Sequence, residues 1–459
     1  MRCPNIGPYL RSMVVGVDAK VPLADGQYVT AINFDNAATT PPFRSVMKEI
    51  MSYAPWYGSV HRGKGYKSVL ASKLYEAARD VVRRFVNASS HDVVIFTKNT
   101  TEAINILAHV LAAAGRNQVV LSTQMEHLAN DLPWRERFTT DYVAIDEAGR
   151  LSLPDLEAKL LKYQGRVKLV AVTGASNVTG YVNPIYEIAR LAHKYDAKIF
   201  VDGAQLVPHV PVDMKPANSL EHIDYLAFSA HKMYAPFGAG VLIGPRDTFA
   251  DAEPVYKGGG AVGLVSAQSV QWDEPPARFE AGTPNMMGVL ALATAIQTLQ
   301  SLDMKAIAGY ERNLIEYAID GLATVPGLTL YRHRDKSEDR VSLISFTLEG
   351  LHHSLVADIL AQEAGIASRS GLFCAHLYVE KLLNLSDEAV AYYQTHDDIL
   401  VPGLVRVSFG LYNDCREVDV LIDCLQRIAK KRDYYKTKYQ QDGRGKRCAA
   451  ASLNRHLYC

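Results

Sequence analysis

The chain has 459 residues and carries 49 basic and 49 acidic side chains, so its formal net charge is zero. This balance gives no electrostatic basis for binding nucleic acid or an anionic membrane, and no apolar stretch approaches the ~20 residues of a spanning helix. The N-terminal residues lack a signal peptide's apolar core, and the six scattered cysteines form no CxxC pair. We therefore expect a cytoplasmic protein with reduced cysteines, no metal site, and neither a nucleic-acid nor a membrane partner.

Short apolar, β-branched runs alternate with helical patterns through the first two-thirds of the chain. A helix is predicted over residues 72–86, where apolar residues recur at helical spacing. Strands separated by crossover helices indicate a mainly parallel sheet that is covered on both faces, and hence an α/β fold. The predicted strands are 93–96, 119–121, 167–173, 199–201, 225–228 and 241–243.

The pattern changes after about residue 290. A helix over 289–302 is followed by predicted strands at 340–348 and 403–409, which indicates a smaller α+β domain. The segment after about residue 434 is polar and basic and is predicted to be a poorly ordered tail. The predicted organisation is an N-terminal segment joining the small domain, a large cofactor-binding domain, the small domain and the tail. These are residues 1–33, 34–288, 289–433 and 434–459.

The most informative feature is Lys232, which follows an apolar run in the sequence SAHK. A lysine whose amine is desolvated can form a Schiff base, because burial lowers its pKa and frees the neutral nucleophile. The preceding strand ends at Asp202, an acid suited to the ring nitrogen of a pyridoxal cofactor. A lysine at a strand end is more often a surface residue, but an acid-bearing strand followed by a lysine-bearing strand favours the cofactor interpretation.

Other strand ends carry polar residues too. Thr100 and Thr101 open a helix, whose first N–H groups offer an anion site, although a plain capping box explains the same residues. His127 and Asn177 follow two further strands, and His127 either lies on a cofactor ring and relays protons or is structural. Because the carboxyl ends of parallel strands converge on one crevice, these side chains are predicted to form a single site.

With these residues in place, the chain resembles class V aminotransferase-type pyridoxal-phosphate enzymes, most closely the cysteine desulfurase and selenocysteine lyase group. The resemblance spans about residues 34–428 and implies a fold-type I transferase with a seven-stranded, mainly parallel sheet in its large domain. It also implies pyridoxal 5'-phosphate as cofactor. The segments that carry it are FDNAAT (34–39), VHRG (60–63), TTEAIN (100–105), EHLAN (126–130), SNVTG (176–180), VDGAQ (201–205), SAHK (229–232), RFEAGTP (278–284) and VRVSFGLYN (405–413).

The resemblance assigns roles around the cofactor ring. It implies that Lys232 is the Schiff-base and proton-shuttling lysine and that Asp202 keeps the ring nitrogen protonated. Gln205 is expected to contact the ring hydroxyl, and His127 is expected to stack on the ring.

The phosphate and the substrate are assigned in the same way. Arg406 is expected to clamp the substrate carboxylate bidentately, with Arg369, Asn36 and Asn177 as further contacts. A homodimer follows from the resemblance, because one phosphate ligand is expected from the neighbouring subunit. The expected phosphate ligands are Thr100, Thr101, Ser229 and His231, with Thr283 as the ligand from that subunit.

Cys374 separates the possible reactions. It lies where desulfurases of this type place the thiol that attacks substrate sulfur, which implies conversion of L-cysteine to L-alanine and a persulfide for a sulfur-acceptor protein. A thiol beside Arg369 has a cationic neighbour that favours the thiolate. The alternatives are an aminotransferase, epimerase or C–S lyase with Cys374 idle, or an inactive scaffold. The segment departs from the family pattern at Leu372 and Phe373, which replace polar, histidine-bearing residues, and in a longer stretch over 380–402.

Overall fold

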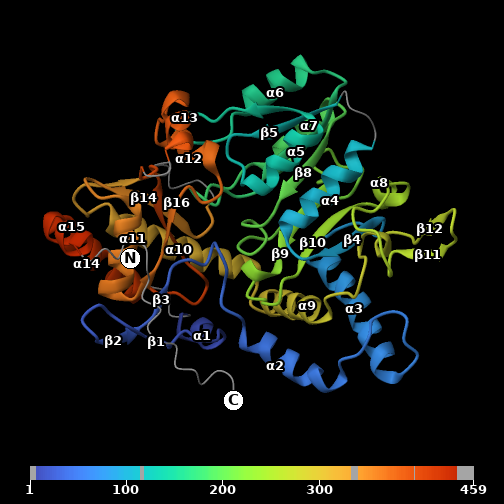
Figure 1. Cartoon of the computed structure of the whole chain (residues 1–459), viewed down its shortest axis with the longest axis horizontal. Helices are drawn as coiled ribbons and strands as arrows, with labels where there is room; N and C mark the ends of the chain where they lie inside the picture. The colour runs from blue at the N-terminus through green and yellow to red at the C-terminus, as the bar shows by residue number, and fades with distance from the viewer. Residues whose placement is uncertain (1–6, 114–117, 332–339, 397–398, 442–459) are drawn as a thin grey trace.

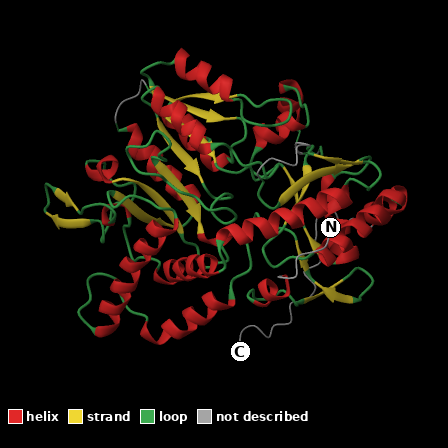
Figure 2. Ribbon diagram, turned by 180° about the vertical axis from the view of Figure 1, so that it is seen from behind, coloured by secondary structure: helices red, strands yellow, loops and turns green. Residues whose placement is uncertain are grey.

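The computed structural model describes residues 7–113, 118–331, 340–396 and 399–441 (Figure 1). The strands gather mainly in two groups, a large sheet and a smaller one, with helices packed around both (Figures 1 and 2). The large sheet comes from the first two-thirds of the chain and the smaller one from the last third, as the sequence patterns predict.

The large sheet has seven strands in the order β4-β10-β9-β8-β7-β5-β6. Strand β10 is antiparallel to both of its neighbours, and the remaining pairs are parallel. This confirms the predicted α/β class and the mainly parallel sheet. The strands are β4 (Asp92–Thr97), β5 (Val119–Thr123), β6 (Thr139–Val143), β7 (Val167–Thr173), β8 (Lys198–Asp202), β9 (Tyr225–Ser229) and β10 (Gly240–Pro245).

Each central strand contributes to a hydrophobic core on both faces of this sheet. In β8, Ile199 and Val201 enter one core while Phe200 enters the other, since successive side chains point to opposite faces. A strand buried on both faces needs a continuous apolar run, which explains why these strands are visible in the sequence. Strand β6 was not predicted: its residues TTDYV lie at the sheet edge, are mostly half-exposed, and form no such run.

Helices cover this sheet, and two of them differ slightly from the predicted bounds. Helix α3 begins at Tyr66, earlier than the predicted start at residue 72, and α9 begins at Met286 rather than at residue 289. The helices and the hairpin of this part are α2 (Arg44–Tyr53), α3 (Tyr66–Phe85), α4 (Thr100–Ala112), α5 (Leu132–Arg137), α6 (Leu153–Lys162), α7 (Ile185–Lys194), α8 (Arg246–Ala250), α9 (Met286–Ser301), β11 (Val262–Val265) and β12 (Val270–Trp272).

The smaller sheet is antiparallel, in the order β13-β14-β17-β16. The N-terminal region joins this part, because β3 pairs in parallel with β15. The elements are α1 (Gly7–Ser12), β1 (Lys20–Pro22), β2 (Tyr28–Thr30), β3 (Ile32–Asn33), α10 (Met304–Leu322), β13 (Leu328–Leu330), β14 (Leu343–Leu348), α11 (His353–Ala364), β15 (Ile366–Ala367), β16 (Arg369–Gly371), α12 (His376–Leu382), α13 (Asp387–Thr395), β17 (Leu404–Ser408) and α14 (Cys415–Lys430).

The predicted start of the tail is wrong. Helix α15 (Arg432–Gln441) continues past residue 434 and packs through Tyr435 and Tyr439, which lie one helical turn apart. The Tyr439 hydroxyl donates to Glu363 Oε1 of α11 at 2.9 Å, which anchors the helix. The rest of the predicted tail, residues 442–459, with Cys448 and Cys459, lies outside the described residues.

The cysteines differ in one respect from the expectation of reduced thiols. Cys415 is disulfide-bonded, whereas Cys374 and Cys424 are free. Within the described ranges, none of the helices has the length and apolar character required to cross a bilayer. The same residues contain no group of three or more histidine, cysteine or acidic side chains arranged to hold a metal.

Candidate active site

A cavity of about 310 Å³ opens at the carboxyl edge of the large sheet. Its walls come from the residues that follow β5, β7, β8 and β9, from the start of α4, and from two segments of the smaller sheet region. This is the position at which open α/β sheets bind ligands, because the strand ends converge there.

All of the predicted site residues line this cavity except Asn36 and Thr283. The structure therefore brings together side chains that are far apart in the sequence. The lining residues that the sequence predicted are Thr100, Thr101, His127, Asn177, Asp202, Gln205, Ser229, His231, Lys232, Arg369, Cys374 and Arg406.

Lys232 and Asp202 form the buried floor of the cavity. Burial lowers the pKa of the Lys232 amine to about 8, although the nearby Asp202 carboxylate opposes the shift. Burial raises the pKa of Asp202, against a hydrogen bond from the Ala204 N–H to its Oδ1 at 3.0 Å and the charge of Lys232. A substantial fraction of this amine is neutral near pH 8, as a nucleophilic or proton-accepting lysine requires.

His127 is neutral in this setting. Burial, followed by the charges of Lys232 and Arg406, lowers its pKa to about 4. Its Nδ1 accepts a hydrogen bond from the Ala129 N–H at 3.0 Å, so the ring proton is on Nε2. A neutral imidazole with a fixed tautomer is suited to lying against an aromatic ring.

The start of α4 forms the anion-binding end of the cavity. Asn99 caps the helix by accepting from the Glu102 N–H, which is one half of the predicted capping box, while the Glu102 carboxylate accepts from the Lys98 N–H in place of the Asn99 N–H. The Thr100 hydroxyl lies 2.7 Å from Ser229 Oγ, which joins the helix start to the end of β9. Burial and Lys232 lower the pKa of neighbouring His231 to about 4. Backbone N–H groups, hydroxyls and the helix dipole together favour a phosphate here.

The opposite end is strongly cationic. Arg406 is almost fully buried, and its Nη1 donates to the Asn177 carbonyl at 2.9 Å. Its guanidinium lies 5.0 Å from the centre of the Phe373 ring, a cation–π distance. Burial lowers the pKa of Arg406 to about 10, and the charge of Asp35 opposes this shift. An amino-acid carboxylate is the natural counterion for such an end.

Asp35 is a residue that sequence reasoning missed. It accepts from Arg406 Nη2 at 3.2 Å and from Arg369 Nη2 at 2.8 Å, and so joins both arginines. The FDNAAT segment contains Asp35, but the resemblance assigns a contact only to the neighbouring Asn36.

The Cys374 loop has an unusual backbone. Phe373 and Cys374 both adopt left-handed conformations, with φ of 51° and 54°, which are uncommon for residues with side chains. Two hydrogen bonds hold them: Asn177 Nδ2 donates to the Phe373 carbonyl and the Leu128 N–H donates to the Cys374 carbonyl, each at 2.7 Å. The ends of β5 and β7 thus fix a loop that leaves the Cys374 side chain exposed.

Asn36 does not reach the cavity, so the structure does not support it as a direct substrate contact. Its Nδ2 donates to the Ser408 carbonyl at 2.9 Å, and its Oδ1 accepts from the Tyr412 hydroxyl at 2.7 Å. With its polar atoms bonded inside the protein, Asn36 secures the segment that carries Asp35.

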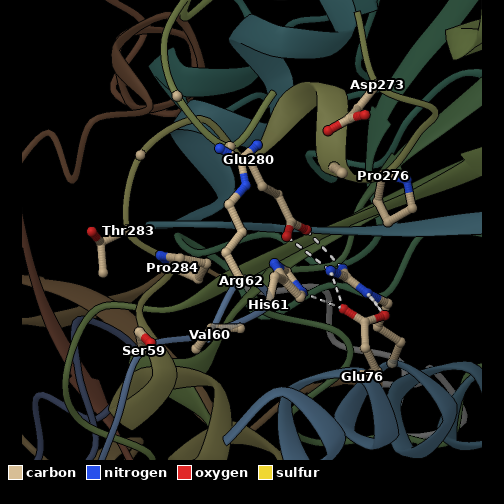
Figure 3. Close-up of a pocket in the computed structure, with 15 residues that line it drawn as sticks. Ser59, Val60, His61, Arg62, Glu76, Asp273, Pro276, Glu280, Thr283 and Pro284 are labelled. Atoms are coloured by element: carbon tan, nitrogen blue, oxygen red, sulfur yellow. Dashed lines mark hydrogen bonds and ion pairs between the residues drawn. The ribbon is translucent and has the colours of Figure 1, made fainter. Parts of the chain in front are cut away.

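Thr283 lines a different cavity, of about 540 Å³, together with Ser59, His61 and Arg62 (Figure 3). Figure 3 shows Thr283 beside Pro284 at one side of this pocket. Arg79, another lining residue, forms ion pairs with Glu76 at 3.0 Å and with Glu280 at 2.7 Å. Within one chain Thr283 is not part of the Lys232 cavity. Its predicted phosphate contact requires a second subunit and stays a prediction.

The cavity fits pyridoxal phosphate in its distribution of donors and acceptors. Asp202 provides an acid for a protonated ring nitrogen, and the start of α4 provides an anion site at the other end. Gln205 donates from Nε2 to the Ala37 carbonyl at 2.7 Å, while its buried Oε1 has no partner among the described residues. A ring hydroxyl would satisfy this acceptor, since buried polar atoms are normally hydrogen-bonded.

A mainly parallel sheet with a buried lysine facing an acid at its carboxyl edge defines the class of pyridoxal-phosphate-dependent α/β enzymes. The profile of the Aminotransferase class-V family matches residues 32–421. The chain belongs to this family.

Similar proteins support the assignment over most of the chain. A probable cysteine desulfurase from Halalkalibacterium halodurans is 34% identical over 412 residues, covering 88% of this chain and 94% of the relative. A cysteine desulfurase from Haloferax volcanii is 35% identical, covering 90% and 92%. The solved apo structure of a Thermococcus onnurineus cysteine desulfurase has a TM-score of 0.80 at 30% identity, covering 94% of this chain and 99% of that one.

Proposed function

We propose that this protein is a pyridoxal-phosphate-dependent cysteine desulfurase that converts L-cysteine to L-alanine and carries the released sulfur on Cys374. The observation that carries the proposal is the meeting of Lys232 and Asp202 from the large sheet with Cys374 and Arg406 from the smaller one. Lys232, Cys374 and Arg406 all line the same cavity of about 310 Å³.

The residues that would hold the cofactor are those that line the floor and the anion-binding end of the cavity. Lys232 would bind it through the amine, Asp202 would pair with the ring nitrogen, and His127 would cover the ring. The start of α4 with Ser229 and His231 would hold the phosphate. When bound, the cofactor supplies an electron sink for the pair that remains when the substrate α-proton leaves.

Arg406 would orient the substrate and Lys232 would move its proton. A carboxylate paired with the planar guanidinium fork fixes the amino acid at the cationic end, with its α-carbon toward Lys232. Because burial keeps the pKa of this lysine near 8, the neutral amine can accept the α-proton and return it later.

The sulfur transfer balances without an added oxidant or reductant. The Cys374 thiolate attacks the substrate sulfur, an S–S bond forms, and the substrate C–S bond breaks. The electron pair of that bond passes to the substrate β-carbon, which then takes up a proton. The sum is L-cysteine plus a thiol giving L-alanine plus a persulfide on Cys374. The exposed position of Cys374 supports onward transfer to a sulfur-acceptor protein.

We also propose that the enzyme is a homodimer in which Thr283 of one subunit completes the phosphate site of the other. The separate cavity around Thr283 supports this proposal, because its polar lining residues face no part of their own Lys232 cavity. Activity in the cytoplasm remains part of the same proposal, as does turnover of L-selenocysteine beside L-cysteine.

The deciding experiment compares Cys374→Ser with Cys424→Ser, the same substitution at the other cysteine that is free among the described residues. Cys374→Ser should lose alanine formation from L-cysteine and keep the cofactor absorbance, and Cys424→Ser should keep both. After one turnover, mass spectrometry of the wild type should find an added sulfur atom on Cys374. Unchanged alanine formation by Cys374→Ser would refute the proposed sulfur transfer. Sulfide with a keto acid in place of alanine would indicate a C–S lyase.

A further inference from the structure

Two arginines face each other across the pair of strands that forms the cationic end of the cavity. In the antiparallel pairing of β16 with β17, Arg369 lies directly opposite Arg406. Like charges in this position repel each other and destabilise the pair. Water screens this repulsion poorly at Arg406, because the side chain of Arg406 is only 3% exposed.

A third segment places a carboxylate between them. Asp35 forms a parallel β-bridge with Ser408, two residues beyond Arg406 on the same strand. Its carboxylate accepts from Arg369 through Nε at 3.1 Å and Nη2 at 2.8 Å, and from Arg406 through Nη2 at 3.2 Å. One acid thus serves two guanidinium groups, and the cluster retains one positive charge for a ligand.

The contacts on Arg406 show what this acid does. Nη1 is held by the Asn177 carbonyl, one face of the guanidinium lies over Phe373, and Nη2 is held by Asp35. The buried Nε has no partner among the described residues. Asp35 itself does not line the cavity and so acts on the ligand only through the arginines.

We propose that Asp35 is the positioning residue of the substrate-carboxylate site: it neutralises Arg369, fixes the fork of Arg406, and leaves one net positive charge for the α-carboxylate. This inference rests on the proposed desulfurase function. Without the acid, two facing guanidinium groups repel each other, Arg369 swings toward solvent, and Arg406 loses its orientation. The inference therefore concerns substrate capture and not the cofactor.

The test uses Asp35→Asn in the cofactor-loaded enzyme, which keeps the shape of the side chain and removes its charge. The KM for L-cysteine should rise by about tenfold, as expected when a buried arginine loses its partly buried partner, with kcat within about threefold of wild type. Inhibition by cysteamine, which lacks the carboxylate, should be unchanged. Asp35→Glu should recover most of the loss. The matched control is Asp146→Asn, which removes an acid paired with Arg150 at the surface and should change neither constant.

A charge-balanced double variant separates positioning from a merely structural role. Asp35→Asn combined with Arg369→Gln removes one charge of each sign, so it should fold and should have a lower KM than Asp35→Asn alone. An unchanged or lower KM in Asp35→Asn, an equal loss of cysteamine binding, or no recovery in the double variant would overturn the inference. If the wild type forms no alanine, the proposed function fails. If the wild type is active and only these shifts are missing, the positioning role alone fails.

Discussion

Removing the guanidinium of Arg406 should weaken substrate binding far more than it changes the cofactor. The side chain is nearly inaccessible to water and is held by the Asn177 carbonyl, Asp35 and the Phe373 ring, so its fork has a fixed direction. Loss of a buried, charge-assisted contact with the substrate carboxylate costs about 2–4 kcal/mol. At 1.4 kcal/mol for each factor of ten, the KM of Arg406→Ala should rise about 30-fold to 700-fold.

The assay is steady-state alanine formation over a range of L-cysteine concentrations, with cofactor absorbance per subunit measured on the same preparations. Arg406→Lys keeps a charge but loses the planar fork, so its KM should lie between those of wild type and Arg406→Ala. Thermal unfolding of each variant separates a damaged fold from a damaged site. A KM within about twofold of wild type in a folded, cofactor-loaded Arg406→Ala would refute the reasoning. Losing a buried charge partner of the substrate carboxylate must cost more binding free energy than a twofold change represents.

Three further predictions test other parts of the structure. Lys232→Ala should abolish cofactor that borohydride can trap, and a reducible adduct on another lysine would contradict the assignment. Light scattering should find the cofactor-loaded enzyme dimeric, and a fully active monomer would exclude the proposed contribution of Thr283 across subunits. The hydrogen bond to Asp224, opposed by burial, raises the pKa of His193 above its usual value of about 6.5. The charged His193 therefore stabilises the fold fully below about pH 6.5, and this stabilisation is lost as the pH rises through the folded-state pKa. The difference in melting temperature between wild type and His193→Gln should therefore shrink on going from about pH 6 to pH 8, and a constant difference would contradict this linkage.

The parts of the fold that could be predicted are those in which burial imposes a pattern on the sequence. The central strands are buried on both faces and must be largely apolar, and β7 was predicted with the bounds it has in the structure. Strand β6 and helix α15 were not predicted. Strand β6 is a half-exposed edge strand, and α15 is mostly polar and packs through two tyrosines. In both, pairing or packing against another element selects the structure, and a local pattern does not show this.

The candidate site was predictable to the extent that it follows from strand ends. Once a parallel sheet is inferred, the residues after its strands must meet at one edge, and the structure places Asp202 and Lys232 there. The ion pairs of Asp35 with Arg369 and Arg406 could not be derived in this way. It depends on the register between β16 and β17 and on a β-bridge to a distant N-terminal segment, which are facts of three-dimensional pairing.

The departures around Cys374 acquire a physical meaning in the structure. Phe373, one of the two residues expected from the resemblance to depart from the family pattern, is buried beneath Arg406 and presents an aromatic face to the guanidinium. Its carbonyl and that of Cys374 are held by the ends of β7 and β5, which stabilises two consecutive left-handed residues. The same substitution that weakens the sequence motif therefore supports the substrate clamp and fixes the thiol at the mouth of the cavity. An aromatic ring neither ionises nor donates protons, so Phe373 supports the clamp by contacts alone and takes no part in the proton transfers of the proposed reaction.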